Sequence, residues 1–525
     1  MKPPALFRST LIVSLGTALS RVLGFVREVL MAWIFGTSLI KSAFDLAFRI
    51  PNLFRRLLGE GALSAAFIPV FTETLKHEGK DAANLLVARI ATLLGAVLAV
   101  IVGLGILAIW GVEQMFDLGT RAAAVLPLVR IMLPYTLFIC LAALSMGVLN
   151  SFGYFAIPAL APVLLNLVWT AALLWICPHL GGTQEQQIMV LAWCIVGAGV
   201  LQLVGQIPML RRCGMVWRPS FQWDDVRVRR VLLLMGPAAL GLGVYQVNFV
   251  VDGVLAMLVG PWAPAALTYA ERLIYLPLGI IATALGTVLL PTFSHQASAA
   301  RHDQMAETLG ISLRAILLAM TPAAVGLMVL VYPVVRLIYI WNGGAFDAAS
   351  LQQTARALIF YSPGLVVFSI YKMIVPVFYA LKDTRNPVRV GLWSVLLNFV
   401  LNLLFIYTWP TGWQHAGLPF ASVLASAVNC AVLGWMLRAR IGDPDWRAVR
   451  RTALRALAAS VLMGAAAWWC QRALEALMLA RGVEDKLSQM ASIGGAIVAA
   501  MAVYGVALLV IARDDLLLLV RARRR

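Results

Sequence analysis

Apolar runs of about 20 to 30 residues recur from one end of the chain to the other, and they limit what it can fold into. A helix of about 20 apolar residues crosses the hydrocarbon core of a bilayer, which is roughly 30 Å thick. Only 13% of the 525 residues are charged, against roughly 25% in a soluble domain. The sequence therefore predicts an all-α, polytopic membrane protein.

We expect fourteen transmembrane helices, and no long polar stretch separates them. The first 20 residues mimic a signal peptide, but the chain continues as RVLGFVREVLMAWIF without a polar start. We therefore interpret them as part of an uncleaved first helix. The expected spans are residues 6–35, 41–74, 83–110, 122–149, 156–178, 187–210, 229–258, 265–296, 309–340, 351–380, 388–409, 415–437, 451–472 and 488–512.

The net charge of +18 is concentrated in alternate loops and in the C-terminal RARRR. This asymmetry predicts that both termini lie in the cytoplasm, and an even number of helices agrees with it. Because the charge is explained by membrane orientation, we do not expect nucleic-acid binding. The basic loops hold Lys76, Lys80, Arg211, Arg212, Arg218, Arg227, Arg229, Arg230, Lys382, Arg385, Arg389, Arg438, Arg440, Arg447, Arg450 and Arg451; the opposite loops hold little beyond Lys41, Arg121, Arg472, Arg481 and Lys486.

Residues that carry enzymatic chemistry show no recognisable arrangement. The six cysteines have no paired spacing, so neither disulfides nor a metal site is indicated. The five histidines are scattered, and no Gly-rich phosphate loop is present. We therefore expect a protein that is not an enzyme and has no cofactor.

Two sequence matches indicate an internal duplication. ALSAAFIPVFTE begins at Ala62 and ALGTVLLPTFSH at Ala284, with Pro69 and Pro291 in register. APVLLNLV in the fifth span likewise matches WSVLLNFV in the eleventh. Both pairs are six helices apart, which predicts two parallel six-helix lobes with a binding site between them near the bilayer midplane. We assign the lobes to residues 1–220 and 221–445, and two extra helices to residues 446–525.

The second span carries an unusual number of charges. At 100° per residue, Asp45, Arg49, Arg56 and Glu60 fall on one polar stripe. A kink at Pro51 would instead bring Arg55 onto the face of Arg49. A structural alternative is that Asp45 pairs with Arg49, and Arg56 with Glu60, within the helix.

Other spans add Arg21, Arg27, Glu271 and Arg272. An arginine at the bilayer centre costs about 3 kcal/mol or more unless it meets water or a partner, so these residues predict a hydrated cavity. Surplus guanidinium groups attract a polyanion, and their planar fork suits phosphate. Asp252 is a candidate cation site with backbone carbonyls, or else the partner of an arginine.

Four ordered motifs resemble the MviN/MurJ family of bacterial lipid II flippases, in the multidrug/oligosaccharidyl-lipid/polysaccharide exporter superfamily. They are SRVLGFVRE, AFRIPNLFRRLLGEGALSAAFIPVF, YAERL…LPLGIIATALGTVLLP and FYALKDTRNPV, and the resemblance spans essentially the whole chain.

The resemblance implies a fourteen-helix flippase of the inner membrane with a cationic central cavity and alternating access. Its substrate is lipid II, and the two extra helices form a groove for the lipid tail. By motif match, Arg21, Arg27, Arg55 and Arg272 occupy the places of arginines required for transport and would bind the pyrophosphate. Asp45, Arg49, Arg56, Glu60 and Glu271 would support them in the cavity.

Two departures from the family pattern affect this expectation. Ser42 stands where relatives commonly have Asp, and Tyr275 where some have Glu, so the resemblance implies no gating role for an acid at these two positions. The coupling energy would come from the membrane potential or a monovalent cation.

Alternatives to lipid II transport also remain open. They are a flippase for another undecaprenyl-linked saccharide, a drug/cation antiporter of the superfamily, a membrane enzyme of lipid-linked sugar metabolism, and a scaffold or partner of the wall-synthesis or division machinery.

Overall fold

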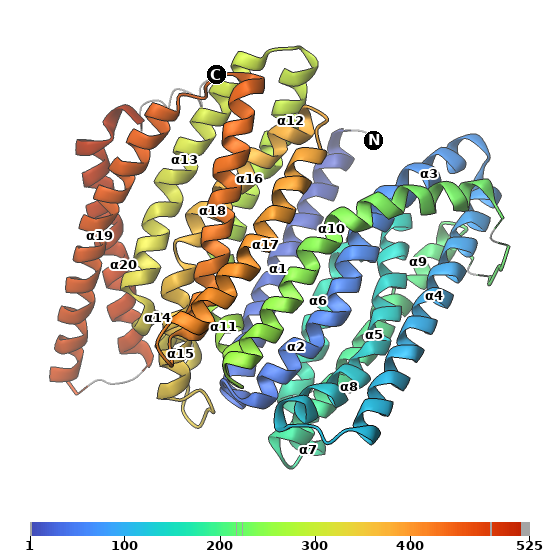
Figure 1. The fold of residues 1–525 in the computed structure, drawn as a ribbon, viewed down its shortest axis with the longest axis horizontal. Helices are drawn as coiled ribbons and strands as arrows, with labels where there is room; N and C mark the ends of the chain where they lie inside the picture. Colours follow the sequence, from blue (N-terminus) through green and yellow to red (C-terminus); the bar gives the residue numbers. More distant parts are fainter. Residues whose placement is uncertain (1–2, 217, 223, 483–485, 516–525) are drawn as a thin grey trace. The chain divides into compact units, whose positions relative to one another are not determined.

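The computed structural model describes residues 3–216, 218–222, 224–482 and 486–515, and these form helices joined by short loops (Figure 1). Within the described residues, each of the fourteen expected spans coincides with one helix or with consecutive helices. Among the residues that the structure describes, ten stretches are long and apolar enough to cross a membrane, or eleven if α15 (Ala348–Tyr361) and α16 (Gly364–Ala380), bent by 42°, make one span. The all-helical membrane fold is therefore confirmed, whereas the count of fourteen crossings stays a prediction.

The chain divides into two compact units, Met1–Ala265 and Ala266–Arg525. The first unit thus includes the helix over 229–258 that we assigned to the second lobe. The second unit includes the two extra C-terminal helices. The lobe boundaries inferred from the duplication stay a prediction. The first unit contains α1 (Pro3–Phe35), α2 (Leu39–Phe54), η1 (Arg55–Ala62), α3 (Leu63–His77), α4 (Lys80–Met115), α5 (Thr120–Ser151), α6 (Ala156–Ala171), η2 (Ala172–Ile176), α7 (Cys177–Leu180), α8 (Gln184–Val204), α9 (Ile207–Arg212) and α10 (Val226–Val259).

The core of the first unit forms where α2 packs against α5, and where α5 packs against α4 and α8. Aromatic rings fill it: Trp169 of α6 meets Phe44 and Phe48 of α2 edge-on, with ring centroids 5.3 and 5.1 Å apart. Helix α1 lies along α6 (Figure 1). Helix α6 packs against α1 and also contributes Trp169 to the aromatic core. It therefore connects the first helix of the chain to that core.

The charged second span is continuous but changes its winding. Pro51 lies inside α2, and the helix then passes into the π-helix η1 at Arg55. A π-helix has i→i+5 hydrogen bonds, so its side chains no longer follow the 100° spacing of an α-helix. Arg49 is buried and Arg56 is exposed, but both approach the ring of Phe249, with Cζ 4.3 and 5.8 Å from its centroid. The single polar stripe, which includes the Glu60 side chain outside the described residues, stays a prediction.

The second unit is built on α13, α16 and α18, with the α19–α20 hairpin packed on α13 (Figure 1). Its elements are α11 (Ala263–Pro277, which begins just before the boundary), η3 (Leu278–Ala282), α12 (Thr283–Ser298), α13 (His302–Val329), α14 (Val331–Tyr339), α15 (Ala348–Tyr361), α16 (Gly364–Ala380), α17 (Arg385–Thr408), α18 (Gln414–Ile441), α19 (Trp446–Ala480) and α20 (Lys486–Ile511).

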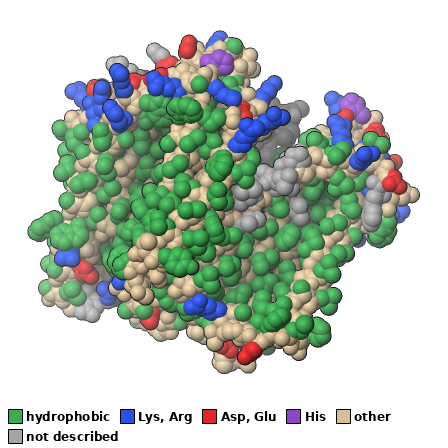
Figure 2. Space-filling model, viewed as in Figure 1, with side chains coloured by type: hydrophobic (Ala, Val, Ile, Leu, Met, Phe, Trp, Pro, Cys, Tyr) green, Lys and Arg blue, Asp and Glu red, His purple; other side chains and the backbone are tan. Residues whose placement is uncertain are grey.

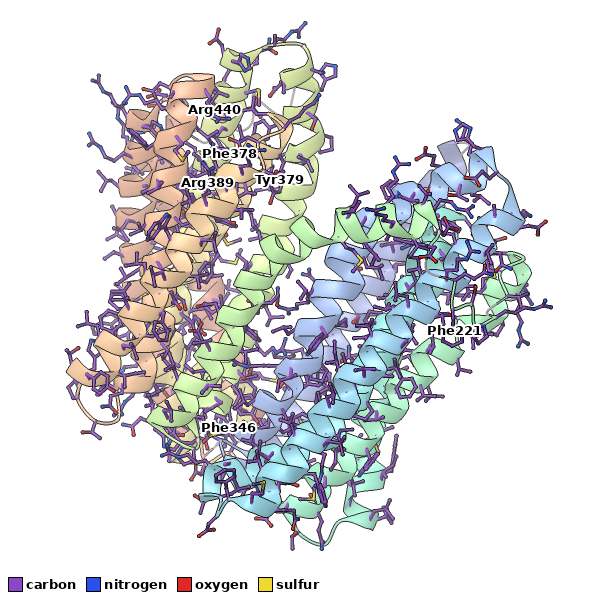
Figure 3. The ribbon with its side chains drawn as sticks, turned by 45° about the vertical axis from the view of Figure 1, so that its right-hand side comes forward. Phe221, Phe346, Phe378, Tyr379, Arg389 and Arg440 are labelled. Carbon is purple, nitrogen blue, oxygen red and sulfur yellow. The ribbon has the colours of Figure 1, made fainter. Side chains whose placement is uncertain are left out.

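The two ends of the second unit differ in character. Phe378, Tyr379, Arg389 and Arg440 lie toward one end, and Phe346 lies toward the other (Figure 3). Basic side chains gather at the first of these ends, where α18 leads into α19, and the flanks of the unit between its ends are largely apolar (Figure 2). This pattern fits helices whose sides face lipid and whose basic loops share one side of a membrane. The exposed arginines at this end include Arg438, Arg440, Arg447, Arg450 and Arg451.

Candidate functional site

Arg27 of α1 is buried among partners from its own helix and from α6. Its Nη2 donates to Glu28 Oε1 at 2.7 Å, and its Nη1 donates to Asn166 Oδ1 at 3.0 Å. The guanidinium also lies 4.1 Å from the ring centroid of Trp169. Arg27 and Glu28 are only 7% and 4% exposed. Arg27 therefore has an acidic partner, Glu28, on its own helix and a polar partner, Asn166, on α6.

Asn166 fastens α1 to α6, a role that sequence reasoning missed. Its Nδ2 donates to the carbonyl of Ser20 at 2.9 Å, while its Oδ1 accepts from Arg27. In the aligned repeat motif, Asn398 is also buried and donates to Ser422 Oγ of α18 at 3.1 Å. The asparagine that ends each copy of the VLLN motif thus makes an interhelical hydrogen bond in its own unit. Buried amides are commonly used in this way in membrane helix bundles.

On the sequence alone, Lys41 falls among the loop charges. In the structure Lys41 instead lies inside α2 and is fully buried. Its Nζ lies 2.5 and 2.6 Å from the two carboxylate oxygens of Asp45, and 4.0 Å from Glu28 Oε2. Asp45 therefore pairs with Lys41, four residues before it, and the predicted pair with Arg49 is replaced. The i, i+4 spacing of Lys41 and Asp45 was the sequence signal for this contact.

Ser42 takes part in the packing of α2 instead of carrying a charge. It is fully buried, and its Oγ accepts a hydrogen bond from the backbone N–H of Ala265 at 3.2 Å. A hydroxyl thus stands where the family resemblance implies a carboxylate, while Lys41, Glu28 and Asp45 form a network in the same helix and in α1.

Arg49, Arg55 and Arg56 have three different environments. Arg49 is buried and donates to the carbonyl of Phe249 in α10 at 2.7 Å. Arg55 opens the π-helix, is half-buried, and donates from Nε to Asn52 Oδ1 at 3.2 Å. Arg56 is exposed, with its Cζ 5.8 Å from the Phe249 ring centroid. The Glu60 side chain, and hence its predicted pairing with Arg56, lies outside the described residues.

The remaining predicted site residues are less enclosed. Arg21 of α1 is exposed. In the second unit, Glu271 is half-buried and Arg272 is exposed on α11. Asp252 accepts from the Asn248 amide at 3.3 Å. Across the described residues, no group of three or more His, Cys, Asp or Glu side chains is placed to hold a metal ion.

The bundle of long apolar helices, with charged side chains inside its first unit, defines the class as a polytopic α-helical membrane protein. Solved structures agree: one titled "Lipid II flippase MurJ, inward closed conformation" has a TM-score of 0.77 at 22% identity and covers 96% of this chain and 99% of its own. An inward-facing multidrug resistance MATE family transporter of the MOP superfamily has a TM-score of 0.65 at 15% identity, covering 83% and 96%. At these identities the likeness shows the fold alone.

The sequence places the chain within one family of that class. The family model "Lipid II flippase MurJ" matches residues 31–480, and the chain belongs to this family. A lipid II flippase MurJ of Burkholderia cenocepacia is 35% identical over 479 residues, 89% of this chain and 90% of the relative. A probable lipid II flippase MurJ of Vibrio cholerae is 33% identical over 476 residues, 88% and 89%. The resemblance noted in the four motifs is thus confirmed.

Proposed function

We propose that this protein moves lipid II, the undecaprenyl pyrophosphate that carries the disaccharide-pentapeptide unit, from the cytoplasmic to the outer leaflet of the bacterial inner membrane. The observation that carries the proposal is the family match over residues 31–480, supported by relatives named lipid II flippases that align over about nine-tenths of their length. The transporter-like fold supports translocation by alternating access.

The pyrophosphate is the part of lipid II that the arginines suit. Arg21 and Arg272 are exposed and Arg55 is half-buried, so their side chains are accessible from outside the packed helices. Arg27 differs, because it is only 7% exposed and donates to Glu28 and Asn166. In this proposal Arg21, Arg55 and Arg272 replace water around the phosphates, and Arg27 holds α1 in place for them.

The direction of transport suits an inside-negative membrane potential. A head group with about two negative charges gains roughly 2.3 kcal/mol per charge per 100 mV on moving outward. Basic loops on the cytoplasmic side, with both termini there, follow from the positive-inside rule. A monovalent cation held near Asp252 is the second candidate for the energy source.

The test is depletion of the protein in cells that lack other flippases, followed by an assay of which leaflet lipid II occupies. We expect lipid II to accumulate in the cytoplasmic leaflet within the time of depletion. Normal arrival of the precursor in the outer leaflet would contradict the proposal. A depleted strain that carries the wild-type gene on a plasmid is the control.

A further inference from the structure

Arg49 joins two helices that are far apart in the sequence. Its Nη1 donates to the main-chain carbonyl of Phe249 in α10 at 2.7 Å, and its Cζ lies 4.3 Å from the centroid of the Phe249 ring. The residue is only 8% exposed. A guanidinium with this little exposure, held by a carbonyl and covered by an aromatic ring, is poorly placed to receive a phosphate.

Gly253 provides the space that this contact needs. A Cβ atom at position 253 would lie 2.6 Å from Arg49 Nη1 and 3.0 Å from Leu46 Cδ1, both closer than van der Waals contact. Glycine inside a helix costs roughly 0.5 to 1 kcal/mol relative to alanine, so helix stability alone does not favour it here. The approach of Arg49 does account for it.

The other end of α10 is also fastened within the first unit. Asp225 caps the helix by accepting from the backbone N–H of Arg227 at 2.8 Å, and it pairs with Arg89 of α4. Arg227 and Arg230 reach Glu78 and Glu73 at 2.8 and 2.9 Å. Helix α10 is thus held at its start by ion pairs and, more than 20 residues later, by Arg49. It is also the last helix that lies entirely within the first unit.

We propose that Arg49 is a positioning residue for transport: it fixes α10 to α2 through Phe249 and does not bind the substrate. The alternative is the cavity role expected from the sequence, in which Arg49 supports the phosphate site directly. The variant Gly253→Ala helps to separate the two roles. Alanine at position 253 displaces the Arg49 guanidinium from Phe249, but it removes no charge from the chain. The transport part of the inference rests on the proposed function; the structural part does not.

The structural part is tested by hydrogen exchange of the peptide that covers residues 249–257, with the full-length protein in lipid nanodiscs. Gly253→Ala should exchange about tenfold faster than wild type there, as expected for loss of one hydrogen bond to a charged group. Gly236→Ala is the matched control, because it makes the same change in α10 where no atom lies within 4 Å. Alanine favours the helix at both sites. Faster exchange of the 249–257 peptide in Gly253→Ala, but not in Gly236→Ala, therefore reports the displaced arginine. Equal exchange in the two variants would overturn the proposal.

The transport part is tested with Arg49→Met, Arg49→Lys and Gly253→Ala in proteoliposomes, with labelled lipid II as the probe. We expect Arg49→Met and Gly253→Ala to slow translocation about tenfold while the Kd for lipid II changes less than about twofold. Arg49→Lys should restore most of the rate, because an ammonium still donates to one carbonyl. A large loss of affinity in Arg49→Met, with Gly253→Ala normal, would show that Arg49 binds substrate and would overturn the proposal. Failure of wild type to move lipid II would refute the proposed function, while the exchange result would still decide the role of Arg49.

Discussion

At the scale of single residues, four charges of the first unit, two of each sign, form one network between α1 and α2. Arg27 and Lys41 carry two positive charges, and Glu28 and Asp45 carry two negative ones. A buried ion pair gains little over an apolar pair, but removing one partner leaves an uncompensated charge. The network therefore ties α1 to α2 and fixes the position of Arg27, and its members depend on one another.

Lys41→Met should destabilise the protein by about 3 to 5 kcal/mol, since Glu28 and Asp45 then share a buried site without their lysine. The measurement is thermal unfolding of the purified protein in detergent. Lys41→Met with Asp45→Leu removes one charge of each sign and should recover much of the loss. Equal destabilisation in the single and double variants would show that the pair does not hold the network together.

Asp225, at the start of α10, should make the free energy of unfolding depend on pH. Hydrogen bonds from the Arg227 side chain, with a further one from Arg89, lower the pKa of Asp225 to about 2. A carboxylate with a lowered folded-state pKa contributes stability above its usual value of 3.8, and that contribution is lost as the pH falls toward about 2.

The comparison of wild type with Asp225→Asn tests this expectation. The variant should lose about 1 to 3 kcal/mol of stability at neutral pH. The difference should be constant between pH 8 and pH 5 and should shrink below the usual value of 3.8. Asp224→Asn, at the exposed neighbouring position, is the control. A difference that persists undiminished below that value would contradict the assignment.

The sequence identified the charged residues of the membrane spans but not their partners. Lys41 and Asp45 are related by helical spacing, which a sequence can show. The contacts of Arg27 with Asn166, and of Arg49 with Phe249, join positions 139 and 200 residues apart. Such pairs depend on how helices pack, and a single sequence carries no periodic signal for them.

At the scale of elements, helices were predictable because their apolar length follows from the bilayer. The π-helix η1 was not, because its wider winding has no simple composition signal; Pro51 indicated only that the helix would be disturbed. Arg49 and Arg56, seven residues apart across this change of winding, both lie against the Phe249 ring, but Arg49 is buried and Arg56 is exposed.

The α19–α20 hairpin is joined to α13 by Asp515, which follows α20 and is 2% exposed. Its Oδ1 accepts from Arg314 Nε at 2.9 Å and from Thr452 Oγ1 at 2.6 Å, and its Oδ2 accepts from Arg455 Nη1 at 3.1 Å. The carboxylate thus connects α13, α19 and the end of α20 within the second unit.

Asp515→Asn should loosen this connection, because it weakens two charged contacts that a neutral amide cannot replace. We expect faster hydrogen exchange in the last turns of α20, by about tenfold or more, with little change in α16. Asp514→Asn is the matched control, since Asp514 is the exposed neighbour. The same exchange in both variants would show that Asp515 does not anchor the hairpin.

At the scale of the whole molecule, the fold class and the family followed from the apolar runs and the four motifs, and both are confirmed. Asn166 and Asn398 occupy aligned positions of the repeat motif, and each makes an interhelical hydrogen bond, to α1 and to α18 respectively. These two partners are not counterparts in the six-helix repeat, so the duplication stays a prediction. The hydrated cavity between the lobes stays a prediction. It depends on how the two units face one another, which helix length and hydropathy do not specify.

The most direct test of the central claim is translocation of labelled lipid II by the purified protein in proteoliposomes under an imposed membrane potential. We predict that wild type moves lipid II away from the negative side, and that Arg55→Ala and Arg272→Ala each abolish movement at equal protein content. Arg447→Ala, an exposed arginine of the basic end of α19, should retain the wild-type rate. Absence of movement by wild type, or normal movement by both cavity variants, would contradict the account.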